Sequence, residues 1–337
     1  NLGAFLGPIV CGWLAVAWGW HWGFGAAGVG MVLGLIQFRV SRGLLAGAGS
    51  QPGNSTPLHG VERFGLAGGG VASCSLVLLG LAGVVKFNPT AIAGVMAYVI
   101  LGIAVVYFAW VFILGGLSKV EKERVSVIVV LFVAAALFWA GFEQAGSSFN
   151  LFAERYTDRQ VDWLKYEVPA AWYQSLNAIF IIVFAPLVAG LWGWLGRRLL
   201  EPSIPLKFAL GLLLLAAGFV VMAGAAKVVA AGNQAMPTWL ITTYLLHTFG
   251  ELCLSPVGLS SVTKLSPRRL VGQMMGIWFL GSSLGNLLAG LLAGEFKADA
   301  LDGWPGLYLK ITILPALAGG LLILFAKTIK RWMEGVK

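Results

Sequence analysis

The sequence consists of long uncharged apolar runs separated by short charged clusters. A helix needs about 20 mostly apolar residues to cross a hydrocarbon core roughly 30 Å thick. Only 11% of the residues are charged and 58% are hydrophobic, whereas a soluble domain carries about 25% charged residues. We therefore predict an all-α integral membrane protein. Uncharged runs occupy residues 64–85, 87–118, 125–142, 168–196, 208–226, 228–250, 270–294 and 311–326.

The first 38 residues also lack charge, and they are too long for one span. At about 1.5 Å per residue they would reach nearly twice across a bilayer, so we expect a hairpin. Its turn is predicted at Trp18-Gly19-Trp20-His21-Trp22, whose tryptophans suit a membrane interface. The two helices of this hairpin bring the predicted number of spans to ten. Because Asn1 opens directly on an apolar run without an initiator Met, we expect a further portion upstream.

The basic residues indicate topology rather than nucleic-acid binding. Twenty-three Lys and Arg against fourteen Asp and Glu give a net charge of +9. The cations cluster between apolar runs, and cytoplasmic loops of membrane proteins collect them. Loops 45–62 and 118–124 and the C-terminus are therefore predicted to be cytoplasmic, and 153–165 to lie outside. No His or Cys spacing typical of a metal site is present.

Glu251 is the only charged residue between Lys227 and Lys264, which places it roughly 20 Å from the inner end of its helix. An ionisable group at this depth faces a cavity or a partner. Ser255, four residues on, shares its helix face. Glu251 is therefore a candidate for binding a cationic group or a transported proton. The alternative is a protonated carboxyl that is hydrogen-bonded inside the bundle and has no function.

Four other residues, in the apolar runs or directly after one, have both a functional and a structural interpretation. Glu143 could be an outer gate or simply a hydrated interfacial acid. Asn177 could bind a ligand, although a lone Asn more often joins two helices. Trp278 could line a cavity or pack in the core, and His247 is more often a satisfied core histidine than a ligand.

Glycines recur at a four-residue spacing, which allows helix backbones to approach closely. Such pairs are common in channels and membrane enzymes as well as in transporters. The spacing therefore predicts tight helix contacts without specifying a function. The pairs are Gly3/Gly7, Gly30/Gly34, Gly272/Gly276, Gly281/Gly285 and Gly290/Gly294.

The run GELCLSPVGLS at 250–260 closely resembles the signature of proton-dependent oligopeptide transporters, a branch of the major facilitator superfamily. Three other stretches agree in order: NLGAFLGPIVCG at 1–12 resembles part of the family's fifth helix, FWAGFEQAGSS at 138–148 its seventh, and GIWFLGSSLGN at 276–286 its eleventh. The resemblance implies a partial major facilitator fold. Residues 1–44 would be the last two helices of the N-terminal bundle, the first of them truncated. Residues 45–63 would be a cytoplasmic linker, 64–117 an extra helical hairpin and 118–337 a complete C-terminal six-helix bundle.

The resemblance also implies roles for individual residues. Glu251 resembles the glutamate that binds the peptide's ammonium, and Glu143 the acid that closes the outer gate with an Arg of the first helix. Asn1 and Asn177 are similar to amides that hydrogen-bond the peptide. Ser255, Trp139, Trp278 and Phe279 resemble pocket-lining residues.

The resemblance therefore implies proton-coupled symport of di- and tripeptides across a bacterial inner membrane by alternating access. The expected partners are peptides, protons, membrane lipid and the missing N-terminal helices, with no nucleic acid. No cofactor is expected, and the proton is the coupling ion. Family relatives carry nitrate or other solutes, but an acidic Glu251 suits an ammonium better than an anion. A polytopic membrane enzyme is a weaker alternative, since His21, His59 and His247 form no catalytic motif.

Overall fold

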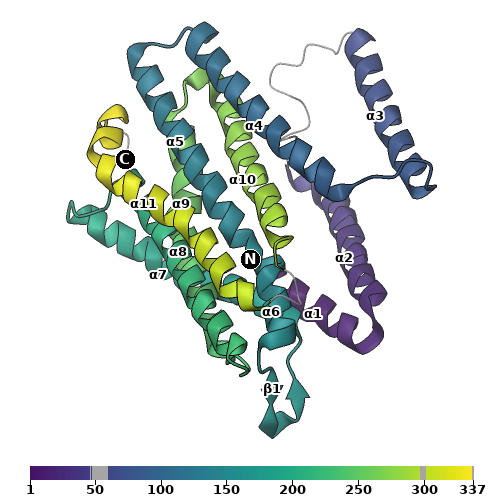
Figure 1. The fold of residues 1–337 in the computed structure, drawn as a ribbon. Helices are drawn as coiled ribbons and strands as arrows, with labels where there is room; N and C mark the ends of the chain where they lie inside the picture. The colour runs from purple at the N-terminus through teal and green to yellow at the C-terminus, as the bar shows by residue number, and fades with distance from the viewer. Residues whose placement is uncertain (46, 48–59, 297–300, 336–337) are drawn as a thin grey trace. The chain divides into compact units, whose positions relative to one another are not determined.

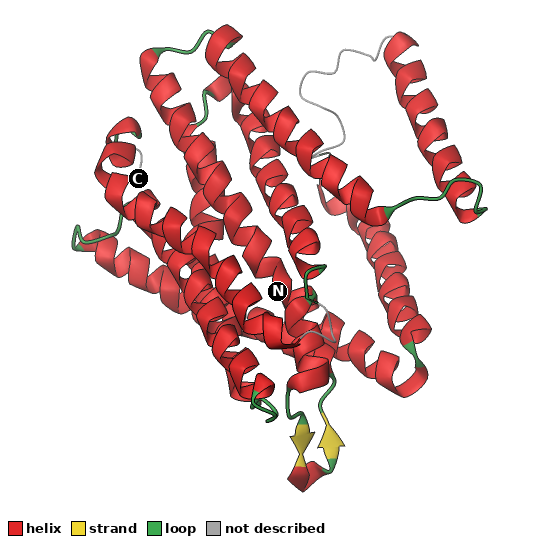
Figure 2. Cartoon of the chain, in the orientation of Figure 1, coloured by secondary structure: helices red, strands yellow, loops and turns green. Residues whose placement is uncertain are grey.

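A computed structural model describes residues 1–45, 47, 60–296 and 301–335. The described residues are almost entirely helical, as Figure 2 shows, which confirms the predicted all-α class. Most of the predicted linker 45–63 lies outside the described residues. Ten helices of 17 residues or more are present in this part of the chain (Figure 1): α1 (Leu2–Trp18), α2 (Trp20–Ser41), α3 (Gly60–Leu81), α4 (Pro89–Leu114), α5 (Lys119–Phe142), α7 (Ser175–Arg197), α8 (Ile204–Ala230), α9 (Pro237–Leu265), α10 (Val271–Ala293) and α11 (Trp304–Trp332).

Eight of these segments are long and apolar enough to cross a membrane. The other two are α1, which is apolar but has only 17 residues, and α9, which has 29 residues but is more polar. The predicted span at 228–250 is displaced, because the helix that contains Glu251 runs from Pro237 to Leu265. The predicted span ends before Glu251 because it was bounded by charged residues, whereas the helix continues through Glu251. The hairpin turn is confirmed: α1 ends at Trp18, Gly19 has a φ of 99°, and α2 begins at Trp20.

The chain divides into two units, residues 1–23 with 96–337, and residues 24–95. The smaller unit contains α3 and the adjoining parts of α2 and α4. Its α3 side chains are mostly exposed, and the ring of Phe87 lies against Gly80. The larger unit holds the core, in which α8 packs on α9 and α11, and α5 packs on α10. The predicted division at 44, 63 and 117 stays a prediction.

Helix α5 begins at a capping box. The Ser118 hydroxyl accepts a hydrogen bond from the Glu121 amide at 3.3 Å, and the Glu121 carboxylate accepts one from the Ser118 amide at 2.9 Å. Together they satisfy two backbone donors that a helix start leaves unpaired. The sequence after α5 forms a 3-10 turn, Glu143–Gly146, and the short helix α6 (Ser148–Tyr156).

Helices α8 and α9 run antiparallel in close contact, because glycines face each other. A Cβ built at Gly211 would lie 2.9 Å from the Gly250 carbonyl oxygen, and one at Gly218 would overlap the His247 ring. The His247 Nε2 atom lies 3.1 Å from the Leu215 carbonyl oxygen, and the residue is 2% exposed. His247 is therefore a satisfied core histidine, as predicted. This packing fixes the position of Glu251, the residue after Gly250.

Of the five predicted glycine pairs, one forms a close helix contact within the described part of the chain. A Cβ at Gly281 would lie 2.9 Å from the Phe132 ring, and one at Gly285 would lie 2.7 Å from the Ala136 carbonyl oxygen. These two glycines seat α10 against α5. The other four pairs meet no side chain of another helix within 4 Å.

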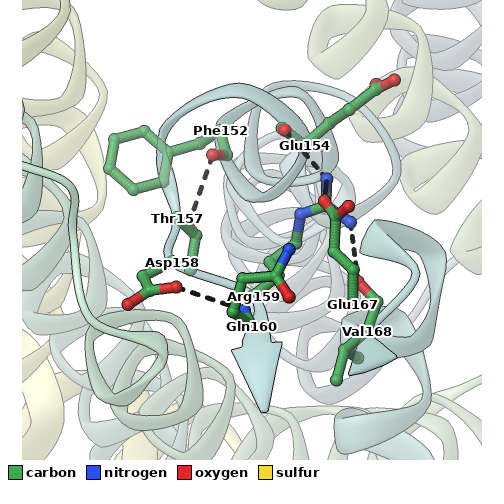
Figure 3. A network of polar contacts seen from close by, with 8 residues as sticks. All are labelled: Phe152, Glu154, Thr157, Asp158, Arg159, Gln160, Glu167 and Val168. Atoms are coloured by element: carbon green, nitrogen blue, oxygen red, sulfur yellow. Dashed lines mark hydrogen bonds and ion pairs between the residues drawn. The ribbon is translucent and has the colours of Figure 1, made fainter. Parts of the chain in front are cut away.

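The polar segment after α6 forms a small antiparallel hairpin that the sequence did not predict. Its strands are β1 (Gln160–Val161) and β2 (Tyr166–Glu167). Arg159 holds this segment together (Figure 3): its guanidinium forms an ion pair with Glu167 at 2.5 Å and donates to the Val168 carbonyl oxygen at 2.7 Å. It also donates to the Glu154 carbonyl oxygen at 3.2 Å. Because short strands are weak alone, these contacts stabilise the turn.

Candidate functional site

A cavity of about 710 Å³ extends along one side of α9 in the larger unit. It runs from Glu251 to Lys264, and side chains of α7 and α8 complete its wall. Pockets of this size hold small ligands. The lining residues are Asn1, Ile181, Ala185, Val188, Ala189, Trp192, Glu201, Ile204, Lys207, Glu251, Leu252, Ser255, Pro256, Val257, Leu259, Ser260, Ser261 and Lys264.

Glu251 lies at the middle of the 29-residue helix α9 and contributes its side chain to the cavity wall. One carboxylate oxygen, Oε2, accepts a hydrogen bond from the Asn177 Nδ2 atom at 2.9 Å. The same Nδ2 atom lies 3.1 Å from the Thr248 hydroxyl oxygen, to which it also donates. Asn177 therefore orients the Glu251 carboxylate and joins α7 to α9, so its structural and functional interpretations are compatible.

Two of the predicted residues line this cavity together with Glu251, whereas Asn177 is outside its lining and bonds to the Glu251 carboxylate. Ser255 lines it one turn beyond Glu251, on the same face of α9, as the spacing predicts. Asn1 lines it at the start of α1. The α1 helix is held on the larger unit because Trp172 Nε1 donates to the Ile9 carbonyl oxygen at 3.1 Å and Ser175 Oγ donates to that of Phe5 at 2.8 Å.

The three predicted aromatic residues lie outside the lining of this cavity. Trp278 is 4% exposed and packs against Phe208 and the glycine at position 258. Phe279, the next residue on α10, points the other way and is 58% exposed. Trp139 packs in a T-shape against Phe142, with ring centroids 5.2 Å apart. Adjacent helical residues differ by about 100° in direction, which accounts for the burial of Trp278 and the exposure of Phe279. The pocket-lining roles of these three residues stay predictions.

Glu143 is half-buried at the C-terminal end of α5, on the 3-10 turn. Its carboxylate interacts electrostatically with that of Glu251, although the two side chains do not bond. Within the described part of the chain, no cation pairs with Glu143. This location is compatible with a gate residue, and the assignment stays a prediction.

A buried cation in the same cavity escaped the sequence-based prediction. Lys207, which falls between two apolar runs and so resembles a loop cation, lies in the first turn of α8 and is 7% exposed. Its ammonium forms an ion pair with Glu201 at 2.5 Å and lies 4.9 Å from the centre of the Trp192 ring. A sequence signal could have revealed this position. Pro205 marks the start of an apolar helix, and Lys207 is a lone lysine just inside it.

Comparison with known proteins supports the resemblance. A model of the POT family matches residues 1–303. The peptide transporter YePEPT of Yersinia enterocolitica is 40% identical over the whole chain, which covers 67% of that protein. Dipeptide and tripeptide permease A of Klebsiella pneumoniae is 30% identical, with 99% of this chain and 66% of that protein aligned.

Solved structures give the same result. A crystal structure of peptide transporter POT in complex with sulfate superposes with a TM-score of 0.86 at 33% identity, covering 99% of this chain and 67% of that one. A POT family transporter in complex with 5-aminolevulinic acid gives a TM-score of 0.84 at 27% identity, covering 98% and 67%. The chain therefore spans about two thirds of the length of the relatives it matches. On the family model, the identity and the shared fold, this chain is a multi-pass membrane protein that belongs to the POT family.

Proposed function

We propose that the protein carries di- and tripeptides across the bacterial plasma membrane together with protons. One observation carries this proposal: the Glu251 carboxylate, at the middle of α9, lines a cavity and is held by Asn177 at 2.9 Å. A peptide's terminal ammonium is a cation that this carboxylate can pair with. The relatives named as a peptide transporter and as a dipeptide and tripeptide permease support peptides as the ligand class.

The surroundings of Glu251 strengthen the attraction between its carboxylate and a cationic ligand group. Coulomb attraction rises as the local dielectric falls, and the surrounding wall is largely apolar, with Ile181, Ala185 and Val188 on α7. Such a wall contributes few directional contacts, so it tolerates different side chains. Glu251 therefore recognises the feature that all peptides share, and the apolar wall accepts the features in which they differ.

An anion such as nitrate fits this centre less well. The Glu251 carboxylate would repel it, and Glu143 adds a second acidic group that interacts electrostatically with Glu251. Lys207 is a buried cation in the cavity wall, but Glu201 already neutralises it. A peptide therefore remains the better match to the charges around Glu251.

Transport is proposed to proceed by alternating access, in which one bundle rocks against the other around a site near the membrane midplane. A proton moving inward gains about 2.3 kcal/mol for each 100 mV of membrane potential, which supplies a driving force. The loops at 45–62 and 118–124 and the C-terminus are proposed to lie on the cytoplasmic side. The protein is proposed to act as a carrier and not as an enzyme.

Substitution of Glu251 tests the proposal in the protein as its gene encodes it. Glu251→Gln retains size and hydrogen bonding but removes the charge. We expect it to weaken binding of a free dipeptide by more than tenfold, since breaking a buried charged contact costs about 2–5 kcal/mol. An N-acetylated dipeptide lacks the ammonium, so it should bind poorly to the unmodified protein and lose little further in the variant.

The exposed Glu154 offers a matched control, because Glu154→Gln removes a carboxylate whose side chain lies outside the cavity. That variant should bind both dipeptides as the unmodified protein does. Equal weakening of the free and the acetylated dipeptide by Glu251→Gln would refute the ammonium-binding role. Failure of the unmodified protein to take up any dipeptide in proteoliposomes with a pH gradient would refute peptide transport itself.

A further inference from the structure

Another cavity of the larger unit, of about 340 Å³, is lined by side chains of α5, α10 and α11. Its lining combines two opposite charges, Glu295 and Lys310, with apolar side chains that include Leu137, Leu314 and Pro315. A volume of this size holds a small ligand or part of a larger one. The cavity is therefore a candidate binding site apart from the one beside α9.

The two charges lie at the end of the bundle where α10 ends and α11 begins. Glu295 follows the last turn of α10, and its amide donates to the Leu292 carbonyl oxygen at 3.1 Å. Lys310 lies about 9 Å along α11 from Trp304, the first residue of that helix. Both charged side chains are exposed. They therefore lie near the level at which a membrane-spanning bundle meets the lipid headgroups.

Buried aromatic packing holds the segment that contains Glu295 against α11. The centroid of the Phe296 ring lies 4.9 Å from that of Tyr308 and 5.2 Å from that of Trp304. All three rings are buried. Because Glu295 directly precedes Phe296, this contact fixes its backbone beside the first turns of α11, which carry Lys310. The two charges are thus held at one cavity.

The apolar part of the cavity lies deeper along the same helices. Leu314 comes one turn after Lys310 on α11, and Leu137 lies more than a turn before the end of α5. Leu314 is 61% exposed, and the neighbouring Ile313 is also exposed. Apolar side chains that are exposed at this depth of a membrane-spanning helix face the hydrocarbon region. The cavity therefore opens toward lipid.

We propose that this cavity binds a phospholipid whose headgroup carries both a phosphate and a primary ammonium, as in phosphatidylethanolamine. The phosphate pairs with Lys310 and the ammonium with Glu295. An acyl chain occupies the apolar part beside Leu137 and Leu314. The inference is independent of the proposed peptide site, because it uses other residues and another ligand.

The two charges select this headgroup over others. Glu295 and Lys310 form no ion pair with each other in the described chain, so a ligand can bridge them. A phosphate and an ammonium joined by an ethylene link present the complementary charges together. A primary ammonium donates charge-assisted hydrogen bonds to a carboxylate, whereas the trimethylammonium of phosphatidylcholine has no N–H. Phosphatidylglycerol has no cation for Glu295.

The headgroup decides the selectivity, because lipid chains are about as apolar as the side chains they contact. Lipids with the same chains therefore gain the same contacts in the apolar part of the cavity. A soluble zwitterion offers both charges, but it has no chain to lie beside Leu314. A membrane lipid thus matches both parts of this cavity.

The test measures lipid binding to the purified protein, as its gene encodes it, by native mass spectrometry. The protein is titrated in detergent with phosphatidylethanolamine, phosphatidylcholine and phosphatidylglycerol that carry the same acyl chains. We expect phosphatidylethanolamine to bind about threefold or more tightly than phosphatidylcholine, because hydrogen bonds to a carboxylate distinguish the two headgroups. Glycerophosphoethanolamine, which has the headgroup without the chains, should not displace the lipid.

Two substitutions separate the contacts. Glu295→Gln keeps the size and removes the charge, so the ratio of phosphatidylethanolamine to phosphatidylcholine binding should fall toward one. Lys310→Gln removes the phosphate partner, so it should weaken both lipids about threefold and keep their ratio. Because both side chains are exposed, both variants should keep the unfolding temperature. Glu334→Gln is the matched control, since Glu334 is an exposed acid beyond the opposite end of α11, and it should leave both affinities unchanged.

Several results would overturn the lipid site. Equal binding of phosphatidylethanolamine and phosphatidylcholine to the unmodified protein would do so, as would an unchanged ratio in Glu295→Gln. Unchanged affinity for both lipids in Lys310→Gln would refute the phosphate contact. Displacement of the lipid by glycerophosphoethanolamine would assign the cavity to a soluble zwitterion. Peptide binding is not measured in any of these experiments, so their failure would leave the proposed function untouched.

Discussion

Asn177 on α7 donates a hydrogen bond of 2.9 Å to the Glu251 carboxylate on α9, across 74 residues of sequence. The bond joins two helices in the wall of one cavity and points a carboxylate oxygen in a defined direction. The adjoining Thr248 accepts a second hydrogen bond from the same amide at 3.1 Å. Removal of the amide would thus free the carboxylate to rotate.

The first prediction concerns this amide. Asn177→Ala should weaken peptide binding by about threefold to tenfold, because one hydrogen bond contributes about 0.5–1.5 kcal/mol. Binding of a free dipeptide by calorimetry measures the effect. Asn150→Ala is the control, since Asn150 accepts a bond of 3.2 Å from Gln174, whereas the bond to Glu251 comes from Asn177. Unchanged binding in Asn177→Ala would show that Glu251 needs no positioning partner.

The second prediction concerns the contact of α10 with α5. A Cβ at Gly285 would lie 2.6 Å from the Trp139 Cβ and 2.7 Å from the Ala136 carbonyl oxygen, so Gly285→Ala forces backbone to move. We expect a loss of about 1–3 kcal/mol in stability, seen as a lower unfolding temperature in detergent.

Gly276 provides a control on the same helix. A Cβ at this position would meet no atom within 4 Å in the described chain, so Gly276→Ala should be neutral or stabilising by up to about 1 kcal/mol. An equal drop in unfolding temperature for both variants would contradict the close contact at Gly285.

The third prediction concerns the hairpin formed by β1 and β2. Arg159→Gln removes the ion pair with Glu167 and the bond to the Val168 carbonyl oxygen. Because Glu167 is half exposed, its ion pair contributes little stability on its own, and we expect a local effect. Hydrogen exchange of the Tyr166–Val168 amides should accelerate, with the global unfolding temperature nearly unchanged. Lys165→Gln, at an exposed position of the same turn, should leave exchange unaltered.

The fourth prediction concerns topology. In a variant whose native Cys11, Cys74 and Cys253 are replaced by serine or alanine, a cysteine at Gln160 should react with an impermeant maleimide from outside the cell. A cysteine at Arg198, in the connection after α7, should react only from the cytoplasmic side. Labelling of position 160 from the cytoplasm alone would reverse the orientation, and with it the side assigned to the C-terminus.

The sequence by itself determined the all-α membrane class, the turn at Trp18–Trp20, the mid-helix position of Glu251 and its shared face with Ser255. These features depend on apolar run length and on helical periodicity, both of which are local properties. The motif around Glu251 likewise indicated the POT family. The boundary of α9 escaped this reasoning because the charged residue Glu251 interrupts the apolar pattern that marks a span.

Only the tertiary structure decided which distant side chains meet. Glycines allow the backbones of α8 and α9 to approach closely. This packing sets the register that places Lys207 and Glu251 along one cavity. The same packing turns Trp278 into the core and leaves Phe279 exposed. Neither result follows from spacing within one helix, because each depends on how two helices pack against each other. The sequence thus determines the elements and their polar residues, and packing determines the site that these residues form together.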